Sequence, residues 1–249
     1  MLIQSDYHIH ASFYRLKTPE APAGPTAAEQ IAAARAAGSR YVGILEHCNM
    51  AKHHPFHCLE ELSAEFHAPG FKRQDAFLGV EADLDDDGSD ACGKNGREKL
   101  HLDYVIGSVH LSPARIPDVN TYLETEYRRI RNALICNDNV NVIGHPFGEG
   151  IRYERAGLVP KWGFHLIPRK WLDELIALAV NSGKALEINR CDPEDPAYRD
   201  FLMCLRDSGA WFSIGSDAHS TAGVKAAKTR TRWLESLGFQ EEHHWRVKT

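Results

Sequence analysis

The chain has 249 residues, of which 43% are hydrophobic and 25% are charged, proportions typical of a soluble globular protein with a buried core. The formal net charge of -5 argues against a broad basic surface for nucleic acid. No apolar run approaches the roughly 18 residues that span a bilayer, and the opening MLIQSDYHIH lacks the basic and apolar regions of a secretory signal. We therefore expect a cytoplasmic protein that neither enters a membrane nor binds nucleic acid.

Seven short apolar runs, rich in β-branched residues, predict strands. They cover residues 2–10, 40–47, 76–82, 102–110, 140–145, 184–189 and 210–219. Helix-like segments lie between several of these runs, and this alternation is typical of βα units in an α/β protein. No internal repeat or linker divides the sequence, and seven such units suit a barrel of parallel strands better than an open sheet. We therefore predict a single domain over residues 1–249.

Residues that start and stop helices mark four of the connecting segments. Thr26 and Glu29 have the spacing of a capping box, and Thr121 and Glu124 repeat it. Pro196 suits the first turn of a further helix. The predicted helices cover residues 26–38, 121–136, 169–181 and 196–209.

Six cysteines are scattered singly, with no C-x-x-C pair, so neither a disulfide framework nor a cysteine-rich zinc site is expected. The 14 histidines are the unusual feature of the composition. Many of them, with several acids, fall at the ends of predicted strands, whereas His243 and His244 near the C-terminus are expected on the surface. The strand-end residues, in chain order, are His8, His10, His47, Glu81, His110, His145, Glu187, Asp217 and His219.

The C-terminal ends of parallel barrel strands meet at one face, so these side chains are expected to converge there. His8 and His10 are two residues apart on one strand and therefore point to the same side. A single histidine at a strand end is more often an ordinary hydrogen-bonded residue than a ligand. Burying many imidazoles and carboxylates together without counter-charge is costly, however, and metal ions are the simplest source of that charge.

The sequence resembles the PHP (polymerase and histidinol phosphatase) family. The motifs that carry the resemblance occur in the family's order and span nearly the whole chain. They are DYHIH (6–10), EH (46–47), GVE (79–81), SVH (108–110), GHP (144–146) and GSDAH (215–219). The resemblance implies a distorted seven-stranded (β/α)7, TIM-like barrel with two or three metal ions at the C-terminal ends of its strands.

The resemblance also implies how the ligands divide among the ions. One ion would be held by His8, His10, Glu81 and Asp217, and Glu81 would bridge to a second ion held by His110 and His145. A third ion would take His47 and His219. Members of the family with three ions have a further His or Asp some seven or eight residues after the first histidine, where this chain has Arg15 and Leu16. Neither residue can be a ligand, so we expect a firm dinuclear centre and a weak or absent third site.

Such a centre predicts a metal-dependent phosphoesterase of histidinol-phosphatase type. Two divalent ions would hold a hydroxide near neutral pH and bind the phosphate of a small phosphomonoester. If the third ion is absent, His219 or Asp217 would protonate the leaving alkoxide. Zinc, manganese and iron all suit imidazole and carboxylate ligands. The candidate phosphate-binding side chains, which follow strand ends, are Arg190, Arg152, Arg155 and Arg115.

Three alternatives remain open from the sequence. The same metals could serve another phosphate ester, such as phosphotyrosine or a nucleotide phosphate. The chain could instead be a non-catalytic metal-binding module, like inactive PHP domains attached to DNA polymerases. Hydrolysis of a C–N bond by an amidohydrolase-type barrel is a further possibility, although no lysine stands at a predicted strand end for carboxylation.

Overall fold

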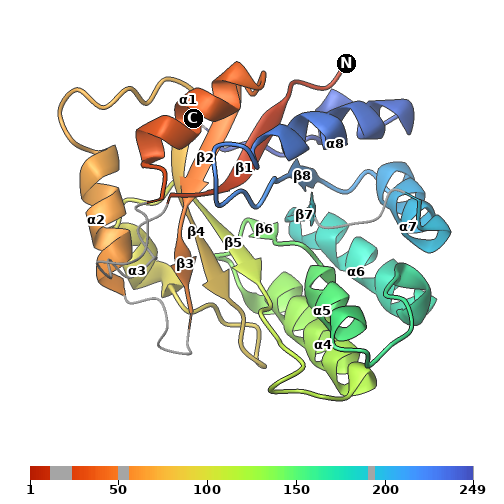
Figure 1. Cartoon of the computed structure of the whole chain (residues 1–249). Coiled ribbons are helices and arrows are strands. Elements are labelled where there is room, and N and C mark those ends of the chain that lie inside the picture. The colour runs from red at the N-terminus through yellow and green to blue at the C-terminus, as the bar shows by residue number, and fades with distance from the viewer. Residues whose placement is uncertain (12–23, 50–55, 190–193, 249) are drawn as a thin grey trace.

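The computed structural model describes residues 1–11, 24–49, 56–189 and 194–248 (Figure 1). The strands are β1 (Ser5–His10), β2 (Tyr41–Leu45), β3 (His47–Cys48), β4 (Ala76–Asp83), β5 (Tyr104–Ser108), β6 (Val142–Ile143), β7 (Ala185–Ile188) and β8 (Phe212–Ile214). The α-helices are α1 (Ala27–Ala36), α2 (Phe56–Phe66), α3 (Gly93–Lys99), α4 (Val119–Cys136), α5 (Ile151–Arg155), α6 (Arg169–Ser182), α7 (Pro196–Asp207) and α8 (Lys225–Ser236). Short 3-10 helices are η2 (Gly148–Gly150), η3 (Phe164–Leu166) and η4 (Glu241–His243).

The strands form a nearly closed barrel in the order β1-β2-β4-β5-β6-β7-β8, with every pair parallel. Backbone hydrogen bonds join β1 to the segment after β8, from Asp217 N to His8 O (2.8 Å) and from His10 N to Ala218 O (2.9 Å). The helices lie outside the strands (Figure 1). The predicted distorted (β/α)7 barrel is confirmed.

One predicted strand, 40–47, is split in the structure. β2 ends at Leu45, and the following pair His47–Cys48 forms β3, which pairs with the far end of β4. The backbone N–H of Glu81 donates to Glu46 O across this junction (3.0 Å). The split aligns His47 directly with Glu81 in the strand register.

Three predicted helix starts rest on a capping residue or a proline, and two of these are confirmed. The Thr26 and Glu29 capping box is formed, and Pro196 occupies the first turn of α7 behind the cap Asp195. The prediction for Thr121 is wrong, because α4 begins at Val119. Asp118 caps that helix by accepting from Thr121 N (2.7 Å), and aspartate is as good an N-cap as threonine.

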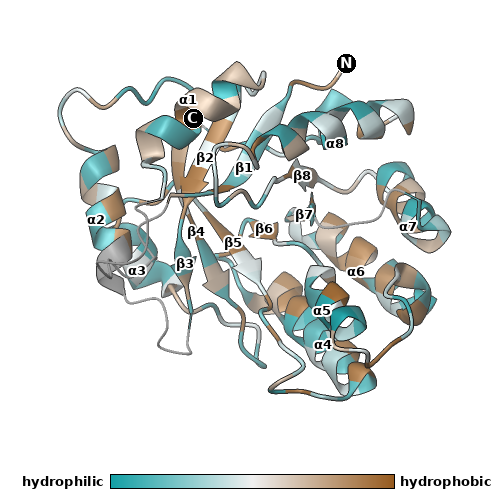
Figure 2. Ribbon diagram, viewed as in Figure 1, coloured by the Kyte–Doolittle hydropathy of each residue, from teal (hydrophilic) through white to brown (hydrophobic). Residues whose placement is uncertain are grey.

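An aromatic cluster fills the inside of the barrel. Tyr104 is fully buried and donates to the backbone oxygen of Tyr7 (2.7 Å). Strands β2 and β4 face it with glycines, since a Cβ on Gly43 or Gly79 would lie 2.2 Å from an atom of Tyr104. Trp245, from the C-terminal segment, contacts this cluster with its ring 5.1 Å from that of Tyr7. Figure 2 shows hydrophobic colour along β2 and the first part of β4, whereas the outer helix α8 is mostly hydrophilic.

The expectation that His244 lies on the surface is wrong. The residue is only 2% exposed, and its ring stacks on Phe212 at 4.9 Å. Its Nε2 is 2.9 Å from the hydroxyl of Ser5. The C-terminal segment folds back along β8, where Trp245 N donates to Phe212 O (2.8 Å). Among the described residues, no helix is both long and apolar enough to cross a membrane.

Candidate metal centre

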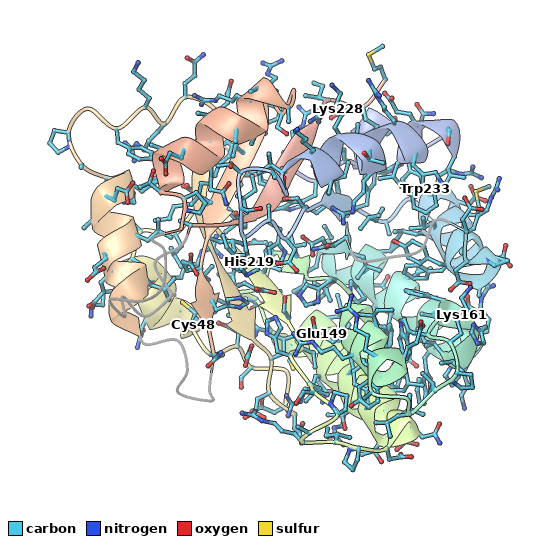
Figure 3. All side chains as sticks on the ribbon, viewed as in Figure 1. Cys48, Glu149, Lys161, His219, Lys228 and Trp233 are labelled. Atoms are coloured by element: carbon cyan, nitrogen blue, oxygen red, sulfur yellow. The ribbon has the colours of Figure 1, made fainter. Side chains whose placement is uncertain are left out.

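The histidines and acids predicted at strand ends meet at the C-terminal mouth of the barrel. Their rings form a continuous set of contacts: His10 stacks on His219 at 4.0 Å and on His47 at 4.4 Å. Figure 3 shows His219 near the middle of the molecule, whereas Lys228 and Lys161 lie at its edges. The convergent residues are His8, His10, His47, Glu81, His110, His145, Asp217 and His219.

A β-bulge in β1 directs the first two histidines into the mouth. Between Asp6 and Ile9 the strand advances three residues while β2 advances two. The extra residue allows Tyr7 to join the aromatic interior and His8 to face the mouth, although the two are adjacent. His8 and His10 then present their Nε2 atoms to each other at 3.2 Å, which confirms that they share a face.

Glu81, near the end of β4, is the central carboxylate of the mouth. Its Oε2 lies 2.9 Å from His47 Nδ1 and 3.4 Å from the Nε2 atoms of His8 and His10. Its Oε1 lies 2.8 Å from His145 Nε2 and 3.1 Å from His110 Nε2. One carboxylate thus divides its two oxygens between two groups of imidazoles, as a bridging ligand would.

Asp217 and His145 occupy strained backbone positions. Their φ angles are 55° and 27°, in the left-handed region that few non-glycine residues adopt. Such conformations cost on the order of 1–3 kcal/mol each and cluster at functional sites. The Asp217 turn brings Oδ1 to 3.2 Å from His10 Nε2 and to 3.6 Å from His219 Nδ1.

Within the part of the chain that the structure describes, four groups of three side chains have ligand atoms within 4.8 Å of one another. They differ from the division that the family resemblance implies, because His145 groups with His8 and His47 groups with His110, each pair with Glu81. His47 and His219 also have His10 beside them, so a third position would have three imidazoles rather than two. The groups are His8–His10–Asp217, His8–Glu81–His145, His47–Glu81–His110 and His10–His47–His219.

Three further carboxylates lie behind the imidazoles. Glu187 is among the strand-end residues expected to converge at the mouth, whereas Glu46 and Asp83 are not. Glu187 Oε1 is 2.8 Å from His8 Nδ1, and Asp83 Oδ1 is 2.6 Å from His110 Nδ1. Glu46 lies farther from its histidine, with Oε2 3.8 Å from His10 Nδ1. All three stand within two residues of a predicted strand end, which was the signal available in the sequence.

These carboxylates set the protonation of the histidines. Burial alone disfavours an imidazolium, but Glu187 and Glu81 together raise the pKa of His8 well above its usual value. Burial is likewise outweighed at His10, where Asp217, Glu46 and Glu81 raise the pKa to about 10. Burial prevails at His219 and lowers its pKa to about 4.

The donor set fits a bound cation. Because Glu187 accepts from Nδ1 of His8, a neutral His8 presents the lone pair of Nε2 to the mouth. That lone pair faces carboxylate oxygens of Glu81 and Asp217, at 3.4 and 3.6 Å, which are acceptors as well. Converging buried acceptors require either extra protons or a metal ion between them, and imidazole with carboxylate is a ligand set that zinc and other transition metals accept.

Three of the four predicted substrate arginines lie among the described residues. Arg152 is half-exposed on α5, and its Nε pairs with Glu149 Oε2 at 2.5 Å. Arg115 is exposed in the loop after β5, and Arg155 is exposed at the end of α5. Arg190 lies outside the described residues, as do Arg15 and Leu16.

Comparison with known proteins gives relatives in sequence and in fold. No family model matches the chain. The DNA polymerase/3'-5' exonuclease PolX of Bacillus subtilis (strain 168) is 28% identical over 183 residues, which are 72% of this chain and 28% of that protein. The chain therefore matches less than a third of the length of this relative.

Among solved structures, the histidinol phosphate phosphatase (HISK) of Lactococcus lactis subsp. lactis Il1403, complexed with zinc, L-histidinol and phosphate, has a similar fold. The match covers 96% of this chain and 95% of that one, with a TM-score of 0.58 and 19% sequence identity. The resemblance that the strand-end motifs predict is thus confirmed: the chain has the barrel fold of a histidinol phosphate phosphatase.

Proposed function

We propose that the chain is a metal-dependent phosphoesterase of the PHP family, built as one domain over residues 1–249. The observation that carries this proposal is the convergence of six imidazoles with Glu81 and Asp217 at the mouth of the barrel. Five of the six imidazoles contact the single carboxylate of Glu81 within 3.4 Å. A packing role explains neither the number of buried charged groups nor the strained turns that present them.

The proposed ligands are His8, His10, His47, Glu81, His110, His145, Asp217 and His219. When bound, two or three divalent ions lower the pKa of water and neutralise the charge of a phosphate group. The carboxylates Glu46, Asp83 and Glu187, with the two proposed ligand carboxylates, make five negative charges in or behind the cluster. Two divalent ions supply four positive charges and would leave the cluster with a net negative charge, whereas three supply six and would leave it with a net positive charge. Because an anionic ester is attracted to positive charge, this balance favours a third ion at the His10–His47–His219 group.

The chain's own groups bind, orient and move protons. If the His10–His47–His219 position holds no ion, we propose that His219 or Asp217 is the catalytic residue that delivers a proton to the leaving alkoxide. The His219 side chain is 28% exposed, more than His47 (15%) or His110 (20%), and is therefore the most open of the three to a substrate. Arg152, Arg115 and Arg190 are proposed to bind the phosphate, and Arg152 would first have to leave Glu149.

The proposed substrate is a small phosphomonoester such as histidinol phosphate, in the cytoplasm. Its support is the shared fold with a phosphatase solved with L-histidinol, phosphate and zinc. Phosphotyrosine and nucleotide phosphates contain the same monoester group and are the alternatives. The same solved structure supports zinc as the ion, and manganese and iron are further candidates.

A second candidate follows from the sequence relative. Because that relative is a polymerase with 3'-5' exonuclease activity, a phosphodiester is the other phosphate ester to consider. The net charge of -5 disfavours a long nucleic acid, whose binding relies on basic surfaces. A metal-binding module without turnover is the remaining alternative.

The test is a substrate panel on metal-free protein reloaded with zinc, manganese or iron, with bound metal measured by elemental analysis. We expect hydrolysis of histidinol phosphate, or of another monoester in the panel, that depends on the added ion and is lost with a chelator. Hydrolysis of only a phosphodiester would support the second candidate. Retained metal with no turnover on any ester would favour the non-catalytic module, and absence of bound metal would refute the proposal.

A further inference from the structure

We infer that Glu187 is a positioning residue that holds two of the proposed ligands, His8 and His145, in one metal-binding geometry. The inference rests on the proposed metal centre and adds to it a residue that would not itself bind an ion. Glu187 lies on β7, between the two ligands in the barrel, and its side chain is fully buried.

One oxygen of Glu187 orients His8. Oε1 accepts from His8 Nδ1 at 2.8 Å, with both side chains at 0% exposure. A carboxylate can only accept, so the proton of a neutral His8 stands on Nδ1 and the lone pair on Nε2. That nitrogen is the one that faces Glu81 and Asp217. The contact therefore fixes both the ring orientation and the tautomer that an ion requires.

The other oxygen of Glu187 holds the turn that carries His145. Oε2 accepts from the backbone N–H of His145 at 2.8 Å, and Asn189 Nδ2 donates to the same oxygen at 3.2 Å. His145 has a φ of 27° and precedes a proline, so its conformation needs support from outside the turn. The second contact supplies that support.

Glu187 is itself unsuited to be a ligand. Both of its oxygens already accept hydrogen bonds, and it belongs to none of the four candidate ligand groups among the described residues. The chain makes room for it with Gly215, where a Cβ would lie 2.0 Å from Oε1. A single buried carboxylate thus supports two members of the His8–Glu81–His145 group, from β1 and from the end of β6.

The test compares Glu187→Gln with two matched variants. The amide that Glu187→Gln introduces can still accept from His8, but its nitrogen would then face the His145 N–H, so one contact becomes donor against donor. Asp83→Asn changes the carboxylate that contacts His110. The two side chains are 17% and 20% exposed, so water can replace the lost acceptor. Glu126→Gln changes another buried carboxyl, which accepts from a backbone N–H of the same loop (Phe147, 2.5 Å). That variant keeps an acceptor oxygen and touches no proposed ligand.

Zinc affinity of each purified protein is measured by competition with a chromogenic chelator, without any substrate. We expect Glu187→Gln to bind zinc about 10–100-fold more weakly, the usual loss for a partner of a ligating histidine. Asp83→Asn should lose less, and Glu126→Gln should match the wild type. Equal affinity of Glu187→Gln and the wild type would overturn the inference, as would equal losses in Glu187→Gln and Glu126→Gln.

A measurement on the wild type keeps the test independent of whether the variant folds. A long-range 1H–15N spectrum of the zinc-loaded protein should show His8 protonated at Nδ1 and not at Nε2. The opposite tautomer would overturn the inference even if the protein is an active phosphatase. A wild type that binds no zinc would instead remove the proposed function itself, so the two failures are distinguishable.

Discussion

Two buried histidines at the mouth of the barrel, His8 and His10, have pKa values displaced in the opposite direction from that of His244 at the other end. At the mouth, carboxylates lie against His8 and His10, and the pKa values of both imidazoles are raised although burial opposes it. At the opposite end, His244 stacks on Phe212, and burial lowers its pKa to about 4. The Glu241 carboxylate is 3.7 Å from its Nδ1, beyond hydrogen-bond distance. His8 and His10 therefore differ from His244 in their partners: carboxylates lie against the two mouth histidines, whereas His244 packs on an aromatic ring.

The two ends of the barrel also differ in what they contribute: the mouth contributes to function and the aromatic interior to stability. The mouth concentrates buried charges and strained turns, each of which costs folding free energy unless a cation is bound. The aromatic interior, with Tyr104 and Trp245, removes apolar surface from water and carries no charge. We expect substitutions at the mouth to change metal binding and activity, and substitutions in the interior to change stability alone.

The largest effect is expected for Glu81→Gln. The substitution removes the charge that five imidazoles share, so zinc affinity should fall by more than the roughly 100-fold that follows loss of a partner of a ligand. Elemental analysis after dialysis and the ester panel measure this loss. With a chelator present, Glu81→Gln should lower the midpoint of thermal unfolding by less than a core substitution does. A large fall there would contradict the division between the two ends.

The strand-end pattern predicted the barrel and the convergence of nine side chains, Glu187 among them, because parallel strands end at one face, which is a property of chain order alone. The β1 bulge could not be predicted, since an inserted residue leaves the apolar pattern of the strand unchanged and only the pairing with β2 shows it. Nothing in the sequence distinguished Glu187 from a ligand, because the distinction depends on what its two oxygens contact. His244 was mispredicted for the same reason: its burial depends on the return of the chain end to β8.

The next effect is expected for His219→Asn, which tests proton delivery at the mouth. We expect kcat to fall by about 10²–10⁴-fold, the usual contribution of a general acid, with zinc retained at the Glu81 groups. Steady-state kinetics and elemental analysis on the same samples separate the two quantities. Unimpaired turnover at full metal content would exclude His219 as the proton donor.

A third effect concerns acid and the opposite end of the barrel. His244 has a pKa of about 4 in the folded chain and an ordinary value of 6.5, so the unfolded chain alone takes up its proton as the pH falls from 6.5 to 4. The folded state should lose on the order of 3 kcal/mol across that window, and none above it. His244→Gln removes this component, so its unfolding free energy should depend less on pH between 4 and 6.5.

Both proteins are compared by urea unfolding with a chelator present, so that metal release does not contribute. His8 and His10 at the mouth act in the opposite direction, because a raised pKa stabilises the folded state at low pH and the contribution is lost as the pH rises through that pKa. They are common to both proteins and cancel in the difference. Parallel pH profiles for the wild type and His244→Gln would show that His244 titrates normally and is not buried as described.

The smallest effect is expected for Gly79→Ala in the interior. The added Cβ would lie 2.2 Å from Tyr104 Cζ and 2.5 Å from its Cε atoms, so the ring or the strand must shift. Overpacking of this kind costs about 1–3 kcal/mol, seen as a lower midpoint of thermal unfolding. Zinc affinity should stay that of the wild type. Tyr104→Leu removes the clashing ring, and because the two sites are in contact, adding Gly79→Ala to Tyr104→Leu should cost less than adding it to the wild type. Equal costs in the two backgrounds would mean that the ring does not fill the space between β2 and β4, and the interior would then not be the rigid support on which the mouth is built.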